Sequence, residues 1–222
     1  SPAVSATNQL FNVVAIPSGV ARYIREGRMV WPLTWVVIVG TLPGVLLGAL
    51  VRVRYLPDPT AFKVFAGLVL LWIGSRLVRD LVGGGGSGGA AAAEARFREL
   101  VSSFGADGGH AGTSPVVVRE FSLRRVSYNF YGETFSFPTA GVFALSLAVG
   151  VVGGIYGIGG GAIIAPFFVA VLGLPVYTVA GAALMGTFVT SVAGVAFSQA
   201  IAPSYPGLAV APDWGLGLLF GL

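Results

Sequence analysis

No Asp, Glu, Lys, Arg or His occurs between Glu133 and Asp213. Soluble domains carry about 25% charged residues, whereas the whole chain has 10% charged and 55% hydrophobic residues. A stretch this long without charge would expose a continuous apolar surface if it folded in water. We therefore predict an all-α, polytopic helical membrane protein, because helices satisfy their own backbone hydrogen bonds in lipid.

Several apolar runs approach the roughly 20 residues that a membrane span needs. We expect spans at Ala3 to Val20, Trp31 to Val51, Pro59 to Val78 and Val176 to Ile201, with a glycine-crowded run at Ala140 to Leu174. Asp213 opens a last, incomplete run, and the chain starts at Ser1 without a Met. We expect the sequence to be truncated at both ends.

Charge and composition divide the chain into three parts. We predict a first transmembrane repeat at 1–82, a linker and insert at 83–138, and a second transmembrane repeat at 139–222. Arginines follow the first and third spans, at 22, 25 and 28 and at 76 and 79, while the loop between the second and third spans carries Arg52 and Arg54. This distribution predicts that the insert is cytoplasmic.

The insert is the only part with the composition of a water-soluble segment. Gly83 to Gly89 reads as a flexible linker, and Ala90 to Phe104 as a short amphipathic helix. Phe121 to Phe130 and Thr134 to Phe137 alternate polar and apolar residues, with one slip at Arg124-Arg125. We predict a β-hairpin that turns at Gly132-Glu133.

Two distant segments resemble each other and indicate an internal repeat. Pro2 to Val20 and Pro175 to Ala193 both begin with Pro and place small and polar residues in mid-span. A Trp opens the span that follows each, at Trp35 and Trp214. Internal repeats recur in secondary transporters.

The glycine-rich segment from Gly153 to Pro166 is the strongest candidate for a binding site. It contains the dinucleotide-binding pattern G-x-G-x-x-A, but no acidic residue follows before Asp213, so that interpretation is rejected. In a membrane, these glycines with Pro166 beyond them predict a broken helix. The free N–H groups of the second half-helix would attract an anion. The candidate substrate-binding residues in this segment are Gly157, Gly159, Gly160 and Gly161.

An alternative is that Gly153, Gly157 and Gly161 only allow close helix packing. Gly40, Gly44 and Gly48 form a stripe of this kind in the second predicted span.

Uncharged polar side chains complete the candidate substrate site. Asn8 and Asn12 lie one helical turn apart, and Thr187 and Ser191 occupy the corresponding part of the second repeat. These groups could hydrogen-bond an anion that must later be released. Alternatively, they bridge helices or bond to their own backbone.

Missing residue types exclude other functions. There is no Cys, His110 is the only His, and no predicted span contains an acidic residue. We predict no catalytic residue, no metal site and no cofactor. The net charge of +4 comes from arginines in short loops beside apolar runs, where they indicate the orientation of the spans in the membrane. We therefore expect no nucleic-acid partner. The expected partners are a small anionic substrate and the lipid bilayer, and the oligomeric state stays open.

Three motifs resemble the TauE/SafE family of sulfite and organosulfonate exporters. They are Asn8-Gln-Leu-Phe-Asn12 running into Pro17-Ser-Gly, Thr41-Leu-Pro-Gly-Val-Leu-Leu-Gly48, and Gly157-Ile-Gly-Gly-Gly-Ala-Ile-Ile-Ala-Pro166. Leu123 to Tyr128 and Phe130 to Thr134 also resemble a hairpin that some members carry between their halves.

The resemblance implies two inverted repeats, each with a broken glycine-rich helix, and a substrate site between them. The first repeat's glycine motif would precede Ser1. The implied function is export of a small sulfur-containing or organic anion by a multi-pass protein of the plasma membrane. The alternative is a membrane-embedded enzyme or an assembly scaffold whose active groups lie in segments outside this sequence.

Overall fold

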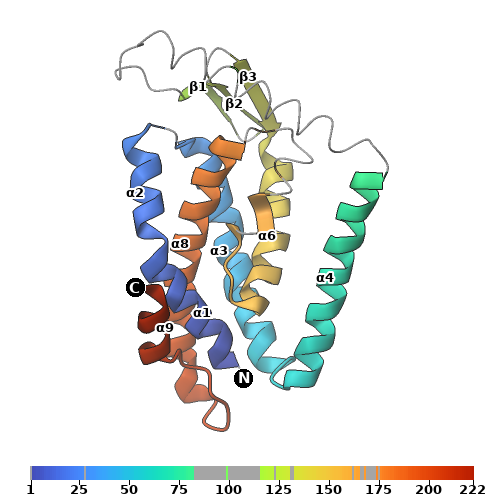
Figure 1. Cartoon of the computed structure of the whole chain (residues 1–222), viewed down its shortest axis with the longest axis vertical. Helices are drawn as coiled ribbons and strands as arrows, with labels where there is room; N and C mark the ends of the chain where they lie inside the picture. The colour runs from blue at the N-terminus through green and yellow to red at the C-terminus, as the bar shows by residue number, and fades with distance from the viewer. Residues whose placement is uncertain are drawn as a thin grey trace.

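A bundle of helices capped at one end by a small β-sheet forms the described part of the chain (Figure 1). The computed structural model describes residues 2–27, 29–82, 99, 116–122, 124–130, 133–161, 163–165, 168, 174 and 176–222. The elements are α1 (Pro2–Ala15), α2 (Pro17–Arg25), α3 (Trp31–Arg54), α4 (Pro59–Val82), β1 (Val116–Phe121), β2 (Arg125–Phe130), β3 (Glu133–Pro138), α6 (Thr139–Tyr156), α8 (Val176–Ile201), the 3₁₀ turn η1 (Ala202–Ser204) and α9 (Trp214–Gly221).

Three described helices are long and apolar enough to cross a membrane, and this confirms the predicted helical membrane protein. They cover Trp31–Arg54, Thr139–Tyr156 and Val179–Ser204. The α8 helix has the predicted bounds, and α3 continues through Pro43 without ending. The α4 helix contains the shorter apolar stretch Thr60–Val69.

The predicted first span consists of two helices, α1 and α2, instead of one. Pro17 has no N–H to donate to the preceding turn, and the helix is interrupted at Ile16 just before it. The 14 residues of α1 rise about 21 Å, which is less than the roughly 30 Å hydrocarbon thickness. The predicted span at Ala3 to Val20 therefore corresponds to two consecutive helices, and Ile16 N donates to Asn12 O at 3.1 Å across their junction.

The insert contains a three-stranded antiparallel sheet in the order β1-β2-β3. The predicted hairpin is present as β2 and β3, but Glu133 pairs with Phe130 and begins β3, so it does not belong to the turn as predicted. A single strand from Phe121 to Phe130 is wrong, because Phe121 ends β1 and Arg125 begins β2. The slip in the alternation marks this turn, where Ser122 Oγ donates to Arg125 O at 2.9 Å. The predicted linker and nearly all of the predicted helix 90–104 lie outside the described residues.

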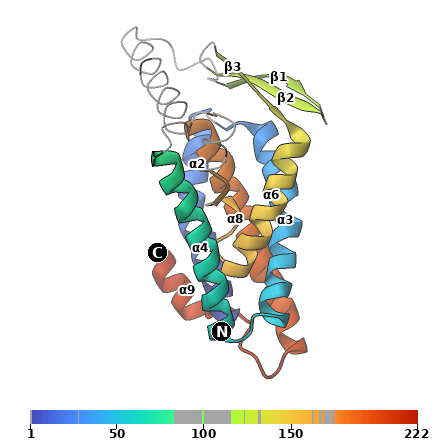
Figure 2. The same ribbon diagram turned by 90° about the vertical axis from the view of Figure 1, so that its right-hand side faces the viewer.

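The sheet packs onto the helical bundle through its buried face. Tyr128 and Phe137 are almost fully buried and belong to the same apolar core as Leu33 of α3 and Val142 of α6. Seen from the side, the sheet lies across the ends of α3, α6 and α8 (Figure 2). The insert is thus continuous with the helical core.

Helices α3 and α6 pack along a line of glycines, as the stripe at Gly40, Gly44 and Gly48 predicts. A Cβ atom placed on Gly44 would lie 2.5 Å from the carbonyl oxygen of Leu147. A Cβ on Gly48 would overlap the carbonyl oxygen of Val151. Only glycine permits this approach between the two backbones.

Candidate functional site

The glycine loop, defined as residues 157–161, follows α6 and reverses the chain. The α6 helix ends at Tyr156, and Gly157 (φ 77°) and Gly159 (φ 74°) are left-handed. A Cβ on Gly160 would lie 3.7 Å from the Cα of Gly150, so the chain runs back beside α6. Helical residues resume at Gly161, and Ile164 N donates to Gly160 O at 3.2 Å.

The loop needs glycine for conformation and for space. Side chains disfavour the left-handed backbone of Gly157 and Gly159. A Cβ on Gly159 would lie 2.8 Å from Thr187 Cγ2. A Cβ on Gly161 would overlap the carbonyl oxygen of Ala183 and Thr187 Oγ1. The loop therefore fits tightly against α8.

Helix α1 holds the other side of the loop through two amides. Asn8 Nδ2 donates to Gly157 O at 2.9 Å, and Asn12 Nδ2 donates to Ile158 O at 3.3 Å. Ser5 Oγ, one turn earlier, donates to Ile155 O at 3.3 Å. These side chains bond the carbonyl groups left without helical partners at the end of α6.

Helix α8 contributes two buried hydroxyls. Thr187 Oγ1 donates to Ala183 O at 2.9 Å, and Ser191 Oγ accepts from Asn12 Nδ2 at 3.4 Å. All eight predicted site residues thus lie at one junction of α1, the glycine loop and α8. They are Asn8, Asn12, Gly157, Gly159, Gly160, Gly161, Thr187 and Ser191.

The glycine loop carries buried N–H groups that the described residues leave unpaired. The N–H groups of Gly157 and Ile158 both donate to Gly153 O. Within the described part of the chain, the N–H groups of Gly159, Gly160 and Gly161 have no hydrogen-bond partner, although all three glycines are buried. Consecutive unpaired N–H groups at the start of a helical segment are suited to an anion.

Sequence reasoning missed a second polar cluster, which contains a buried arginine. Arg52 lies in the last turn of α3, where a loop was expected, and its exposure is only 3%. The missed signal is the spacing, because Arg52 follows Gly48 by four residues and continues the buried face of α3.

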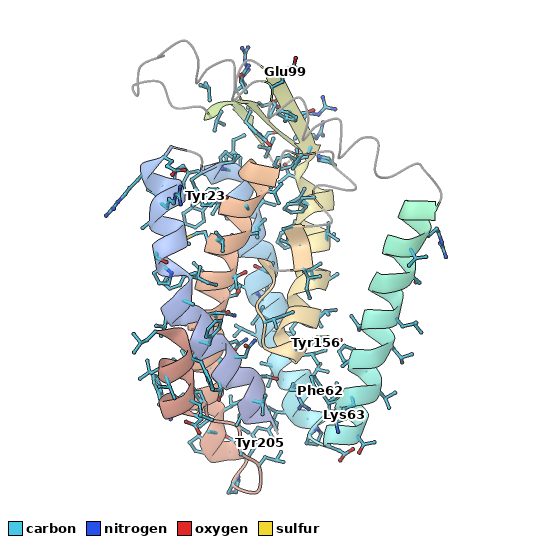
Figure 3. The ribbon with its side chains drawn as sticks, viewed as in Figure 1. Tyr23, Phe62, Lys63, Glu99, Tyr156 and Tyr205 are labelled. Carbon is cyan, nitrogen blue, oxygen red and sulfur yellow. The ribbon has the colours of Figure 1, made fainter. Side chains whose placement is uncertain are left out.

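The guanidinium of Arg52 lies 4.0 Å from the ring centroid of Phe62 in α4. The same ring contacts Tyr156, whose hydroxyl donates to Ala66 O at 2.8 Å (Figure 3). These contacts join α4 to the ends of α3 and α6.

Comparison with known families supports the predicted resemblance. The profile of the family described as "Sulfite exporter TauE/SafE" matches residues 1–222. Neither the curated proteins nor the solved structures include a match to this chain. The matched family consists of membrane transporters and not of enzymes.

Proposed function

This chain belongs to the sulfite exporter TauE/SafE family of multi-pass membrane transporters, and we propose that it exports a small sulfur-containing or organic anion through the junction of α1, the glycine loop and α8. The observation that carries this proposal is the run of N–H groups at the buried glycines Gly159, Gly160 and Gly161, for which the described residues provide no hydrogen-bond partner. Each buried donor without a partner costs about 1–3 kcal/mol, and an oxyanion would relieve that cost.

The amides of α1 make the junction electrically suitable for an anion. Carbonyl groups at the end of a helix carry partial negative charge and would repel an anion. Asn8 and Asn12 donate hydrogen bonds to the carbonyls of Gly157 and Ile158, and so reduce that repulsion. We propose that these amides hold and neutralise the loop, while Ser191 and Thr187 border the anion.

The directions of the helices support a pair of inverted repeats. The α1 helix runs toward the sheet, whereas α8, its counterpart in the second repeat, runs away from it (Figure 1). The α3 and α9 helices, which follow them, also run in opposite directions. We propose that the substrate site lies between the two repeats, where α1 meets α8.

The distribution of arginines supports a cytoplasmic sheet. Arg22, Arg25 and Arg79 lie in the last turns of α2 and α4, at the same end of the bundle as the sheet. The sheet itself adds Arg119 and Arg125. We propose that this end faces the cytoplasm.

Sulfite flux from proteoliposomes tests the proposed function. Vesicles that contain the purified chain are loaded with sulfite, and release is measured against protein-free vesicles. We expect release that saturates with sulfite concentration and falls when Ser191 is changed to Ala. Release equal to that of protein-free vesicles would contradict the proposal.

A further inference from the structure

Arg52 is a buried cation without a hydrogen-bonding counter-ion in the described part of the chain. Its Nε and Nη1 atoms are fully buried and have no hydrogen-bond partner. The ion pair found in that part of the chain, Arg22–Glu26, lies elsewhere. The ring of Phe62 offers the guanidinium a cation–π contact, which provides no hydrogen-bond acceptor oxygen for Nε and Nη1. An arginine placed this way inside a membrane protein indicates a functional site.

Arg52 also lines a small cavity of about 10 Å³. Its other polar walls are Ser5 and Gln9 of α1 and Ser198 of α8, and all three residues are buried. Such a cavity holds about one water molecule. A larger guest therefore requires α1 or α8 to move away from α3.

The cavity continues the polar faces that lead from the glycine loop. On α1, Ser5, Gln9 and Asn12 follow each other at spacings of four and three residues and share one face. On α8, Thr187, Ser191 and Ser198 are spaced by four and seven residues and also share one face. The two faces meet at Asn12 and Ser191 and again at the cavity. Arg52 thus lies at the end of a polar path through an apolar bundle, on the side away from the sheet (Figure 1).

We infer that Arg52, with Gln9 and Ser198, forms a second oxyanion subsite that the substrate occupies after it leaves the glycine loop. This inference rests on the proposed export of an anion. A guanidinium presents a planar fork of N–H donors that fits two oxygens of a sulfite, sulfonate or carboxylate group. The subsite therefore selects anions with two or more oxygens on one centre.

The test compares Arg52→Met and Arg52→Lys with Arg54→Gln, a control at the exposed arginine two residues further along α3. Sulfite is the probe, and the readouts are the sulfite-induced shift in melting temperature and the KM for sulfite flux. For Arg52→Met we expect no loss of melting temperature without sulfite, because an unpaired buried charge is removed. We also expect the sulfite-induced shift to disappear and KM to rise about ten- to hundredfold. Arg52→Lys keeps the charge and should show a smaller rise in KM, and Arg54→Gln should behave as the wild type.

If Arg52→Met lowers the melting temperature and leaves the KM for sulfite unchanged, Arg52 has a structural role and the inference is overturned. In that case wild-type flux would still support the proposed function. Absence of any sulfite response in the wild type would overturn both. If Arg52→Met does not insert, Arg52→Lys provides the test, because lysine lacks the planar fork of N–H donors. An unchanged KM for sulfite in Arg52→Lys overturns the inference, and a raised KM supports it.

Discussion

Asn8 Nδ2 lies 2.9 Å from the carbonyl oxygen of Gly157, although 149 residues separate the two in sequence. This hydrogen bond joins the first described helix to the glycine loop of the second half. It explains why a side chain with a hydrogen-bond donor suits this position better than an apolar residue. The two halves of the chain therefore meet through polar contacts as well as through apolar packing.

Changing Asn8 to Leu should lower the stability of the folded protein. Gly157 is buried, so its carbonyl would lose its partner at a cost of about 1–3 kcal/mol. Thermal unfolding in detergent should show this as a drop of roughly 2–4 °C per kcal/mol. Val4→Ala, at a position on α1 that is 68% exposed, is the matched control. Equal melting temperatures for Asn8→Leu and the wild type would show that the contact does not stabilise the loop.

Asn12 and Ser191 should be energetically coupled. Their side chains form a hydrogen bond at 3.4 Å, which is long, so we expect a coupling energy of about 0.5–1 kcal/mol. A double-mutant cycle of Asn12→Leu and Ser191→Ala, measured by chemical unfolding, gives this value. Strict additivity of the two changes would contradict direct contact between α1 and α8 at this point.

Replacing Gly159 with Ala should destabilise the glycine loop for two separable reasons. The left-handed backbone costs about 1–2 kcal/mol with a side chain, and the new Cβ would press on Thr187 Cγ2 at 2.8 Å. Adding Thr187→Ser removes that methyl group and should restore part of the stability, which thermal unfolding can follow. As a control, Gly67→Ala in α4 meets nothing within 4 Å and should be neutral or stabilising by up to about 1 kcal/mol. If the second change restores nothing, the methyl contact is not a source of strain.

A large side chain at Gly48 should separate α3 from α6. The backbone of α6 leaves no room for even a Cβ there, so Gly48→Leu should cost about 1–3 kcal/mol or more. The yield of monodisperse protein in size-exclusion chromatography measures the damage. Gly74→Leu in α4, where no atom lies within 4 Å of a Cβ, should keep the wild-type yield. Equal yields for the two variants would argue against close packing of α3 on α6 at Gly48.

Cysteine labelling should place the sheet and η1 on opposite sides of the membrane. The chain has no native Cys, so Arg119→Cys in β1 and Ser204→Cys in η1 each create a single reactive thiol at an exposed position. In intact cells, an impermeant reagent should label Ser204→Cys and leave Arg119→Cys unlabelled until the cells are lysed. The reverse pattern would invert the proposed orientation.

Features that depend on neighbouring residues could be predicted from the sequence. The apolar length of Val176 to Ile201 determines α8, and the glycine stripe of α3 predicts close packing against another helix. The structure shows that this helix is α6. Alternation on either side of Gly132 predicts the β2–β3 hairpin. The residue types also indicated which positions would gather at the glycine loop, since few polar side chains occur in these spans.

The tertiary structure decided what those polar side chains contact. The amide of Asn12 donates to Ile158 O and Ser191 Oγ, so it is engaged in holding the loop, which spacing along α1 could not show. Arg52 is buried because α1, α4 and α8 surround the end of α3. The contacts of Asn12 join segments more than a hundred residues apart in sequence, and the burial of Arg52 combines the nearer α1 and α4 with the distant α8. A local pattern defines a helix face, but the free energy of a polar group on that face depends on which distant atoms the fold places against it.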